Sequence, residues 1–163
     1  MVLSTLHTIN AGETINRILG MFEPKEQEQV RIRLADSLRW VVSQRLVPKN
    51  GGGRFALLEI MGSNLRTQEA VRIGESEGKT FYEITEASYP FGWRTFDQTC
   101  LEAYEQGIVT EETALLYCTK RSVVTRGIDG IKKSRGEMST TAGTLRMKSG
   151  EKTIPPVIKS KSK

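Results

Sequence analysis

The stretch that decides the fold lies at the start of the chain: Val2-Leu3-Ser4-Thr5-Leu6-His7-Thr8, an apolar run that ends at the only histidine of 163 residues. Apolar and β-branched residues in such a run predict a buried strand of an α/β sheet. His7 and Thr8 then stand at the C-terminal edge of the sheet, where α/β proteins bind ligands. Histidine exchanges protons near neutral pH, so its imidazole suits a phosphate or a water there. The alternative is a lone histidine hydrogen-bonded to a backbone carbonyl.

Two helices are predicted after this strand. Asn10, followed three positions later by Glu13, forms a helix-start signature, because both side chains accept hydrogen bonds from free backbone N–H groups. This helix is expected to run to Gly20. A second, amphipathic helix begins with Pro24, which suits the first helical position. Its apolar residues recur at helical spacing: Val30, Leu34, Leu38, Val41 and Val42.

A break at residues 48–53, which contain three successive glycines, separates two predicted strands. Residues 41–47 fit a helix end or a strand, whereas residues 54–61 predict a strand whose side chains alternate between two faces. Residues 44–47 and 54–61 are therefore expected to pair as a hairpin. The glycines are not a phosphate-binding loop, because that loop requires Gly-x-x-x-x-Gly-Lys before a helix, and Arg54 here enters a strand.

Helices dominate the chain after Gly62. Capping signatures start them at Asn64, at Thr80 with Glu83, and at Thr95 with Gln98. The predicted helices span about residues 63–76, 80–87, 95–106, 110–118 and 120–131. Large apolar side chains in this part are expected to pack in the core: Trp93, Phe96, Leu101, Tyr104, Leu115, Leu116 and Tyr117.

Composition predicts one soluble domain with a basic tail. Hydrophobic residues make up 37% of the chain, and no apolar stretch reaches the roughly 18 residues that span a bilayer. Residues 132–163 hold nine Lys or Arg and two Glu, a net of +7, which leaves 5 − 7 = −2 for residues 1–131. The tail is rich in Ser, Thr, Gly and Lys, and is expected to be disordered. Cys100 and Cys118 lack metal-ligand spacing and indicate a reducing, cytoplasmic setting.

The order and spacing of short motifs resemble those of the secretion and type IV pilus ATPases. The opening stretch is similar to the "His box" of this family, and the resemblance is strongest to its PilT-like twitching-motility (retraction) ATPases. It covers roughly residues 2–131, with motifs at Val2–Thr8, Asn10–Leu19, Ser43–Val47, Gly51–Arg54, Glu59–Met61 and Thr95–Asp97.

The resemblance implies an α/β fold made of the C-terminal strands and helices of a RecA-like P-loop ATPase core, followed by a mainly α-helical subdomain. Residues 1–62 would belong to the core, residues 63–131 to the helical subdomain, and residues 132–163 to the disordered basic tail. His7 and Arg17 match catalytic positions that face the nucleotide phosphates, and Thr8 matches a nucleotide-binding position. The resemblance supplies no metal ligand in this part of the chain.

The resemblance also implies a function: part of a hexameric ATPase motor that uses ATP and Mg²⁺ to retract type IV pili. Such a motor is cytoplasmic, peripheral to the inner membrane at the pilus base, and works on the platform protein there. The family's Walker A loop, Asp box and Walker B strand precede the His box and are missing from this sequence. The chain alone is therefore expected to bind no nucleotide tightly and to be inactive.

A departure from the family's motifs, and an alternative from a different class, keep other readings open. Residues 65–75 preserve only part of the Ala-Ile-Arg motif of many retraction ATPases, so another secretion-ATPase role fits as well. The alternative from a different class is a nucleotide-independent interaction module of the pilus or type II secretion base. Specific nucleic-acid binding is not expected, because the net positive charge is confined to the tail and residues 1–131 are near neutral overall.

Overall fold

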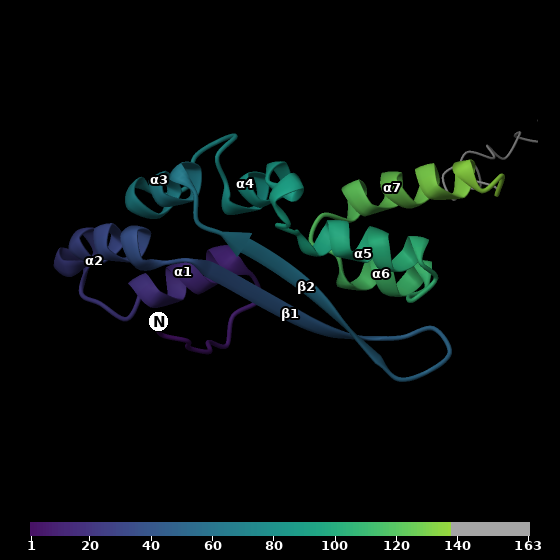
Figure 1. Ribbon diagram of the computed structural model, residues 1–163, viewed down its shortest axis with the longest axis horizontal. Coiled ribbons are helices and arrows are strands. Elements are labelled where there is room, and N and C mark those ends of the chain that lie inside the picture. The colour runs from purple at the N-terminus through teal and green to yellow at the C-terminus, as the bar shows by residue number, and fades with distance from the viewer. Residues whose placement is uncertain (138–163) are drawn as a thin grey trace, which may run out of the picture.

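The architecture is a two-stranded antiparallel hairpin with helices packed along it, seen in a computed structural model that describes residues 1–137 (Figure 1). The elements in chain order are α1 (Ala11–Leu19), α2 (Pro24–Ser37), β1 (Trp40–Pro48), β2 (Arg54–Gly62), α3 (Leu65–Ile73), α4 (Phe81–Ala87), the 3₁₀ turn η1 (Tyr89–Phe91), α5 (Phe96–Glu105), α6 (Glu111–Tyr117) and α7 (Arg121–Ser134).

The predicted hairpin is confirmed. Its register pairs Trp40 with Gly62 at one end and Pro48 with Arg54 at the other. The connecting glycines 51–53 have φ values of 83°, 103° and 81°, a left-handed conformation that glycine adopts without a steric penalty. A glycine-rich tip therefore reverses the chain, as the sequence predicted.

The second helix ends earlier than its apolar spacing suggested. Helix α2 stops at Ser37, because Leu38 is extended with ψ of 131°. Val41 and Val42 lie in β1, where alternate side chains are buried. Two adjacent β-branched residues favour a pleated strand over a helix, which explains why the helical pattern did not continue.

The expected helix starts are observed. Asn10 and Asn64 each accept a hydrogen bond from the third helical N–H of α1 and α3. Thr80 and Thr95 form complete capping boxes with Glu83 and Gln98. Residues 96–134 contain the predicted helices and no strand.

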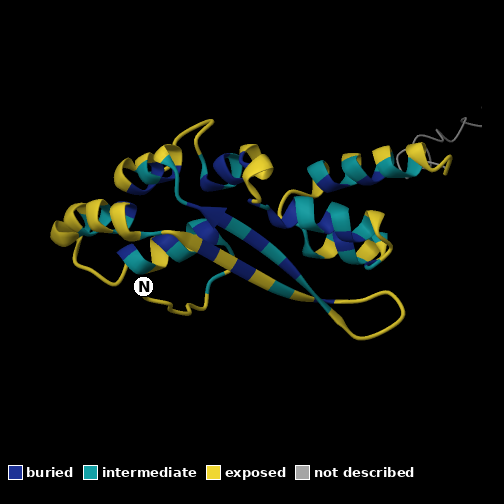
Figure 2. Cartoon of the chain, in the orientation of Figure 1, coloured by how far each residue is buried: buried dark blue, intermediate teal, exposed yellow. Residues whose placement is uncertain are grey.

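The hairpin contributes buried side chains to two apolar cores (Figure 2). The first joins the α1–α4 side to the Val41 and Met61 end of the strands, and the second joins α5–α7 to Val47 and Leu57. Between these two ends the same buried face carries polar residues, with Ser43 opposite Glu59 in the register. The hairpin thus has an apolar end in each core and a polar centre between them.

The prediction of a strand at Val2–Leu6 is wrong. These residues form no strand, and the Val2 and Leu3 side chains are 91% and 85% exposed. A buried strand needs neighbours on its edges, but within residues 1–137 β1 and β2 form the only sheet, and none of residues 2–6 pairs with either strand. The Thr8 N–H instead bonds the Leu6 carbonyl at 3.1 Å, which closes a tight turn around His7.

The mixed α/β class is as predicted, and the division at residue 62 stays a prediction. Helix α7 covers the first three residues of the expected tail, which was predicted to begin at residue 132. The part of the predicted disordered tail that follows Glu137, residues 138–163, lies outside the described residues.

Candidate functional site

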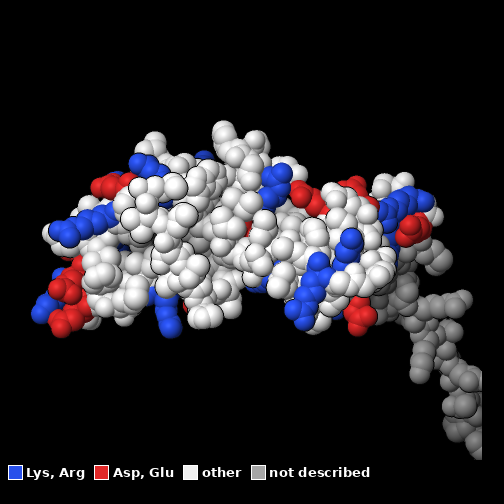
Figure 3. Space-filling model, turned by 60° about the horizontal axis from the view of Figure 1, so that its bottom comes forward, with Lys and Arg blue, Asp and Glu red and all other residues white. Residues whose placement is uncertain are grey.

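His7 and Thr8 line a hollow of about 770 Å³ between the N-terminal segment, α1 and β1. Its wall includes Thr14 and Ile18 of α1 and Val42 of β1. Figure 3 shows the molecule from the side on which the N-terminal segment lies, with charged residues gathered toward both ends and a largely uncharged middle. The hollow therefore combines one imidazole and hydroxyl groups with an apolar floor.

Thr8 is held by a chain of hydroxyl contacts. Its Oγ1 lies 2.7 Å from Thr14 Oγ1, and Thr14 Oγ1 donates to the Asn10 carbonyl at 2.9 Å. Since the single hydroxyl hydrogen of Thr14 is used there, Thr8 is the donor to Thr14. The Thr8 oxygen keeps its acceptor capacity, and its position is fixed by the first turn of α1.

The structure brings together only two of the three predicted site residues. His7 is exposed, and its ring makes no hydrogen bond within residues 1–137, which argues against the alternative of a carbonyl-bound histidine. Arg17 is exposed on α1 and is not among the residues that line the hollow. His7 and Thr8 thus share a hollow, and Arg17 stands outside it on the same helix as Thr14.

A buried carboxylate anchors the helix that follows the site. Glu59, only 5% exposed on β2, accepts a 2.7 Å hydrogen bond from the Ala11 N–H at the first turn of α1. Burial raises the pKa of Glu59, while the Ala11 hydrogen bond and the charge of Arg45 act in the opposite direction. The helix N-terminus favours a negative charge at this place.

Arg45 of β1 reaches from the site toward the C-terminal helices. Its guanidinium stacks on the Phe96 ring at 3.8 Å, donates through Nη1 to the Tyr117 carbonyl at 2.6 Å, and through Nη2 to the Ile9 carbonyl at 3.5 Å. A planar guanidinium suits this combination, because it stacks and donates in its plane at the same time.

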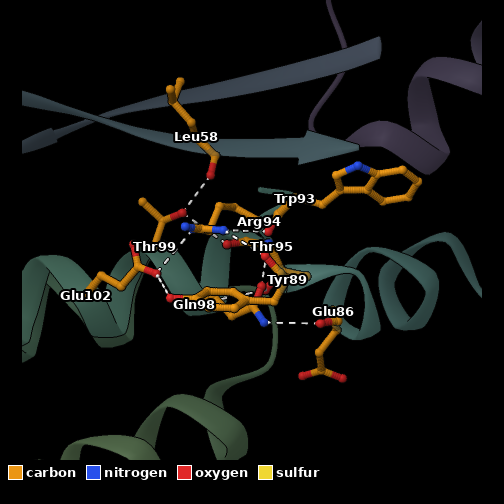
Figure 4. A network of polar contacts seen from close by, with 9 residues as sticks. All are labelled: Leu58, Glu86, Tyr89, Trp93, Arg94, Thr95, Gln98, Thr99 and Glu102. Atoms are coloured by element: carbon orange, nitrogen blue, oxygen red, sulfur yellow. Dashed lines mark hydrogen bonds and ion pairs between the residues drawn. The ribbon is translucent and has the colours of Figure 1, made fainter. Parts of the chain in front are cut away.

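A second polar network fastens α5 to β2 (Figure 4). Thr99 donates to the Leu58 carbonyl at 2.7 Å, and the N–H and carbonyl of Arg94 pair with those of Ile60. Arg94 also lies over the Tyr89 ring at 4.0 Å and pairs with Glu102 at 3.2 Å. These contacts attach the helical part to the hairpin independently of Arg45.

Sequence reasoning missed Arg45 and Asp97 as organising residues. Both lie inside motifs that carry the family resemblance, but their partners are distant backbone groups. The predicted alternation in residues 54–61 puts Glu59 on the same face as Leu57, so a charged residue beside an apolar one on that face was the available signal. No cluster of three metal-ligating side chains occurs within residues 1–137. None of the helices described is long and apolar enough to cross a membrane.

Comparison with known proteins supports the resemblance, although no protein-family profile matches the chain. The chain is 33% identical over 114 residues to the type IV pilus retraction ATPase PilT of Pseudomonas aeruginosa, covering 70% of this chain and 33% of PilT. It is 33% identical over 115 residues to a twitching motility protein of Neisseria gonorrhoeae, covering 70% of this chain and 30% of that protein. The chain thus spans about a third of the length of these relatives.

Solved structures show the same relationship. The pilus retraction motor PilT with bound ADP superposes with a TM-score of 0.61 at 35% identity, over 74% of this chain and 33% of that one. The ATPase DotB of Legionella pneumophila shares the fold, with a TM-score of 0.54 at 23% identity over 68% of this chain and 29% of DotB.

By fold and sequence, the chain is similar to the C-terminal part of secretion ATPases. Within that class it is similar to the PilT-like group of type IV pilus ATPases, as the motifs predicted.

Proposed function

We propose that the chain is the C-terminal part of a hexameric ATPase motor that powers type IV pilus retraction and twitching motility. The observation that carries the proposal is the 35% identity to the ADP-bound retraction motor over the shared fold. The complete motor would be cytoplasmic and peripheral to the inner membrane. Its partners would be further copies of itself and the platform protein of the pilus base.

His7 and Thr8 fit a phosphate group in the complete enzyme. They present an imidazole and a hydroxyl at one hollow, and no carboxylate lines it. ATP with Mg²⁺ would supply the phosphoryl group that is transferred to water. The imidazole of His7 would contact that group, and Thr8, whose hydroxyl hydrogen is used by Thr14, would accept a hydrogen bond from a water beside it.

Arg17 would act from the adjacent face of α1. Its guanidinium is exposed and makes no hydrogen bond or ion pair within residues 1–137, so it is free to meet charge that develops during phosphoryl transfer. His7, Thr8 and Arg17 offer too few donors to hold three phosphates. We therefore expect the isolated chain to bind ATP weakly and to hydrolyse none above background.

The first test is the DNA upstream of the codon for Met1. An in-frame Gly-x-x-x-x-Gly-Lys-Ser/Thr sequence supports the motor, and its absence favours the nucleotide-independent interaction module. The second test measures steady-state ATPase rates of the isolated chain, the complete protein, and its His7→Ala and Arg17→Ala variants. Both variants are expected to lower kcat more than they weaken ATP binding.

Arg33→Ala is the matched control, because Arg33 is an exposed arginine on α2 away from the hollow. It is expected to keep the turnover of the complete protein. Robust turnover by the isolated chain, or wild-type turnover in both the His7 and Arg17 variants, would refute the proposal.

A further inference from the structure

We propose that Arg45 and Glu59 are positioning residues that clamp the segment from His7 to Arg17 onto the hairpin and tie it to the ends of α5 and α6. The inference rests on the proposed function, since it assigns these side chains the task of holding the phosphate-facing residues. Neither side chain touches the hollow itself.

The clamp grips the backbone on both sides of Asn10, the residue that caps α1. Arg45 donates to the Ile9 carbonyl at 3.5 Å, and Glu59 accepts from the Ala11 N–H at 2.7 Å. His7 and Thr8 lie just before this point, and Arg17 lies beyond it on α1. Holding the backbone at residues 9 and 11 therefore sets the orientation of the His7–Thr8 turn and of helix α1, which carries Arg17.

The two gripping side chains come from neighbouring strands of one rigid unit. Arg45 pairs with Leu57 and Ser43 pairs with Glu59 in the hairpin register, so Arg45 and Glu59 are diagonal neighbours on the same face. Both residues lie in the polar centre of that face, between the two apolar cores. A charged pair in this position costs desolvation energy, and the hydrogen bonds to residues 9 and 11 offset part of that cost.

Arg45 extends the clamp to the helical part of the chain. The same guanidinium stacks on Phe96, the first residue of α5, and binds the carbonyl of Tyr117, the last residue of α6. One side chain therefore touches the start of α5, the end of α6 and the N-terminal segment. A displacement of α5 and α6 moves Arg45 and, through the Ile9 carbonyl, the turn that carries His7.

The test separates the clamp from general stability. Glu59→Ala removes the acceptor for Ala11, whereas Glu59→Gln keeps an oxygen there. Glu75→Ala is the matched control, because Glu75 accepts the Phe81 N–H at 2.7 Å in the same manner at the start of α4. Amide exchange is measured on the 163-residue chain, and kcat and KM for ATP are measured on the complete protein.

We expect Glu59→Ala to speed exchange of the Ala11 amide and to lower kcat roughly 10- to 100-fold, since small misplacements of reacting groups cost rates of that order. KM is expected to change less than threefold, and Glu59→Gln to recover most of kcat. Arg45→Lys keeps the charge but loses the planar guanidinium, so its kcat is expected to lie between that of the wild type and that of Arg45→Met. Glu75→Ala is expected to expose the Phe81 amide and keep wild-type turnover.

The outcomes distinguish this inference from the proposed function. Wild-type kcat in Glu59→Ala, or an equal loss of kcat in Glu75→Ala, overturns the positioning role and leaves the motor assignment intact. A complete wild-type protein without ATPase activity overturns the proposed function itself. Unchanged protection of the Ala11 amide in Glu59→Ala overturns the clamp whatever the kinetics show.

Discussion

The carboxylate of Asp97 accepts a 2.9 Å hydrogen bond from the backbone N–H of Lys120, where α7 begins. It also accepts from the Thr119 N–H and from the Tyr82 hydroxyl, at 2.8 Å, while being only 1% exposed. Asp97 thereby joins α4, α5 and α7 at one buried point. Glu59 and Glu75 serve the starts of α1 and α4 in the same way. Three helix N-termini are thus held by carboxylates from outside the helix.

Asp97→Ala is expected to lower the free energy of unfolding by about 2–4 kcal/mol, because it leaves two backbone N–H groups and a hydroxyl without their charged acceptor. Urea unfolding followed by circular dichroism measures the change. Asp36→Ala removes an exposed carboxylate that pairs with Arg72, and is expected to cost less than about 1 kcal/mol. Equal losses in the two variants would contradict the role given to Asp97.

Glu59 makes stability depend on pH in a defined direction. Burial raises its pKa above the usual 4.5, so the folded chain binds this proton more tightly than the unfolded chain does. The stabilisation is complete below pH 4.5 and is lost as the pH rises through the folded-state pKa. We expect the wild type to lose stability relative to Glu59→Gln as the pH rises above about 4.5. Parallel stability curves for the two proteins would refute this.

Two glycine-to-alanine substitutions are expected to act with opposite signs. A Cβ at Gly62 would lie 2.6 Å from the ring of the buried Trp93, and such overpacking costs about 1–3 kcal/mol. Gly130 lies in α7, and a methyl group added there would meet nothing within 4 Å, so Gly130→Ala should add about 0.5–1 kcal/mol through helix propensity. Thermal unfolding of both variants tests this, and a stabilised Gly62→Ala would show that the ring has room to move.

The two thiols are expected to react at different rates. Burial raises the pKa of Cys100 to about 12, and its side chain is 0% exposed. Burial also raises the pKa of Cys118, but this residue is only half-buried. Because the thiolate is the reactive form, iodoacetamide at about pH 8 should modify Cys118 first and Cys100 only after unfolding. Mass spectrometry of timed samples decides the order, and early labelling of Cys100 would contradict its burial.

Local signals in the sequence were sufficient for most of the elements. Capping residues such as Thr80 and Thr95 accept hydrogen bonds from N–H groups three positions away, so their effect can be predicted from the local sequence. The hairpin was equally accessible, because alternation and a glycine tip are local patterns. The strand expected at residues 2–6 failed because a strand depends on partners elsewhere, and no described segment pairs with it.

The candidate site was predictable only in part. His7 and Thr8 were found from the apolar run that precedes them, and the structure places both at one hollow. The supporting contacts were hidden, because Arg45 bonds to Tyr117 across 72 positions and Glu59 to Ala11 across 48. Such pairs follow from the packing of the whole chain. Leu116, expected in the core, is 69% exposed because it lies on the outer side of α6.

The hairpin is the only sheet available to either apolar core within residues 1–137. Neither group of helices has strands of its own, so both depend on the same hairpin, and each group buries one end of it. Intermediates with one half folded and the other half lost are therefore disfavoured. Despite its two cores, the chain should unfold in a single cooperative transition, with the fluorescence of Trp40 and Trp93 and the helical circular dichroism changing together.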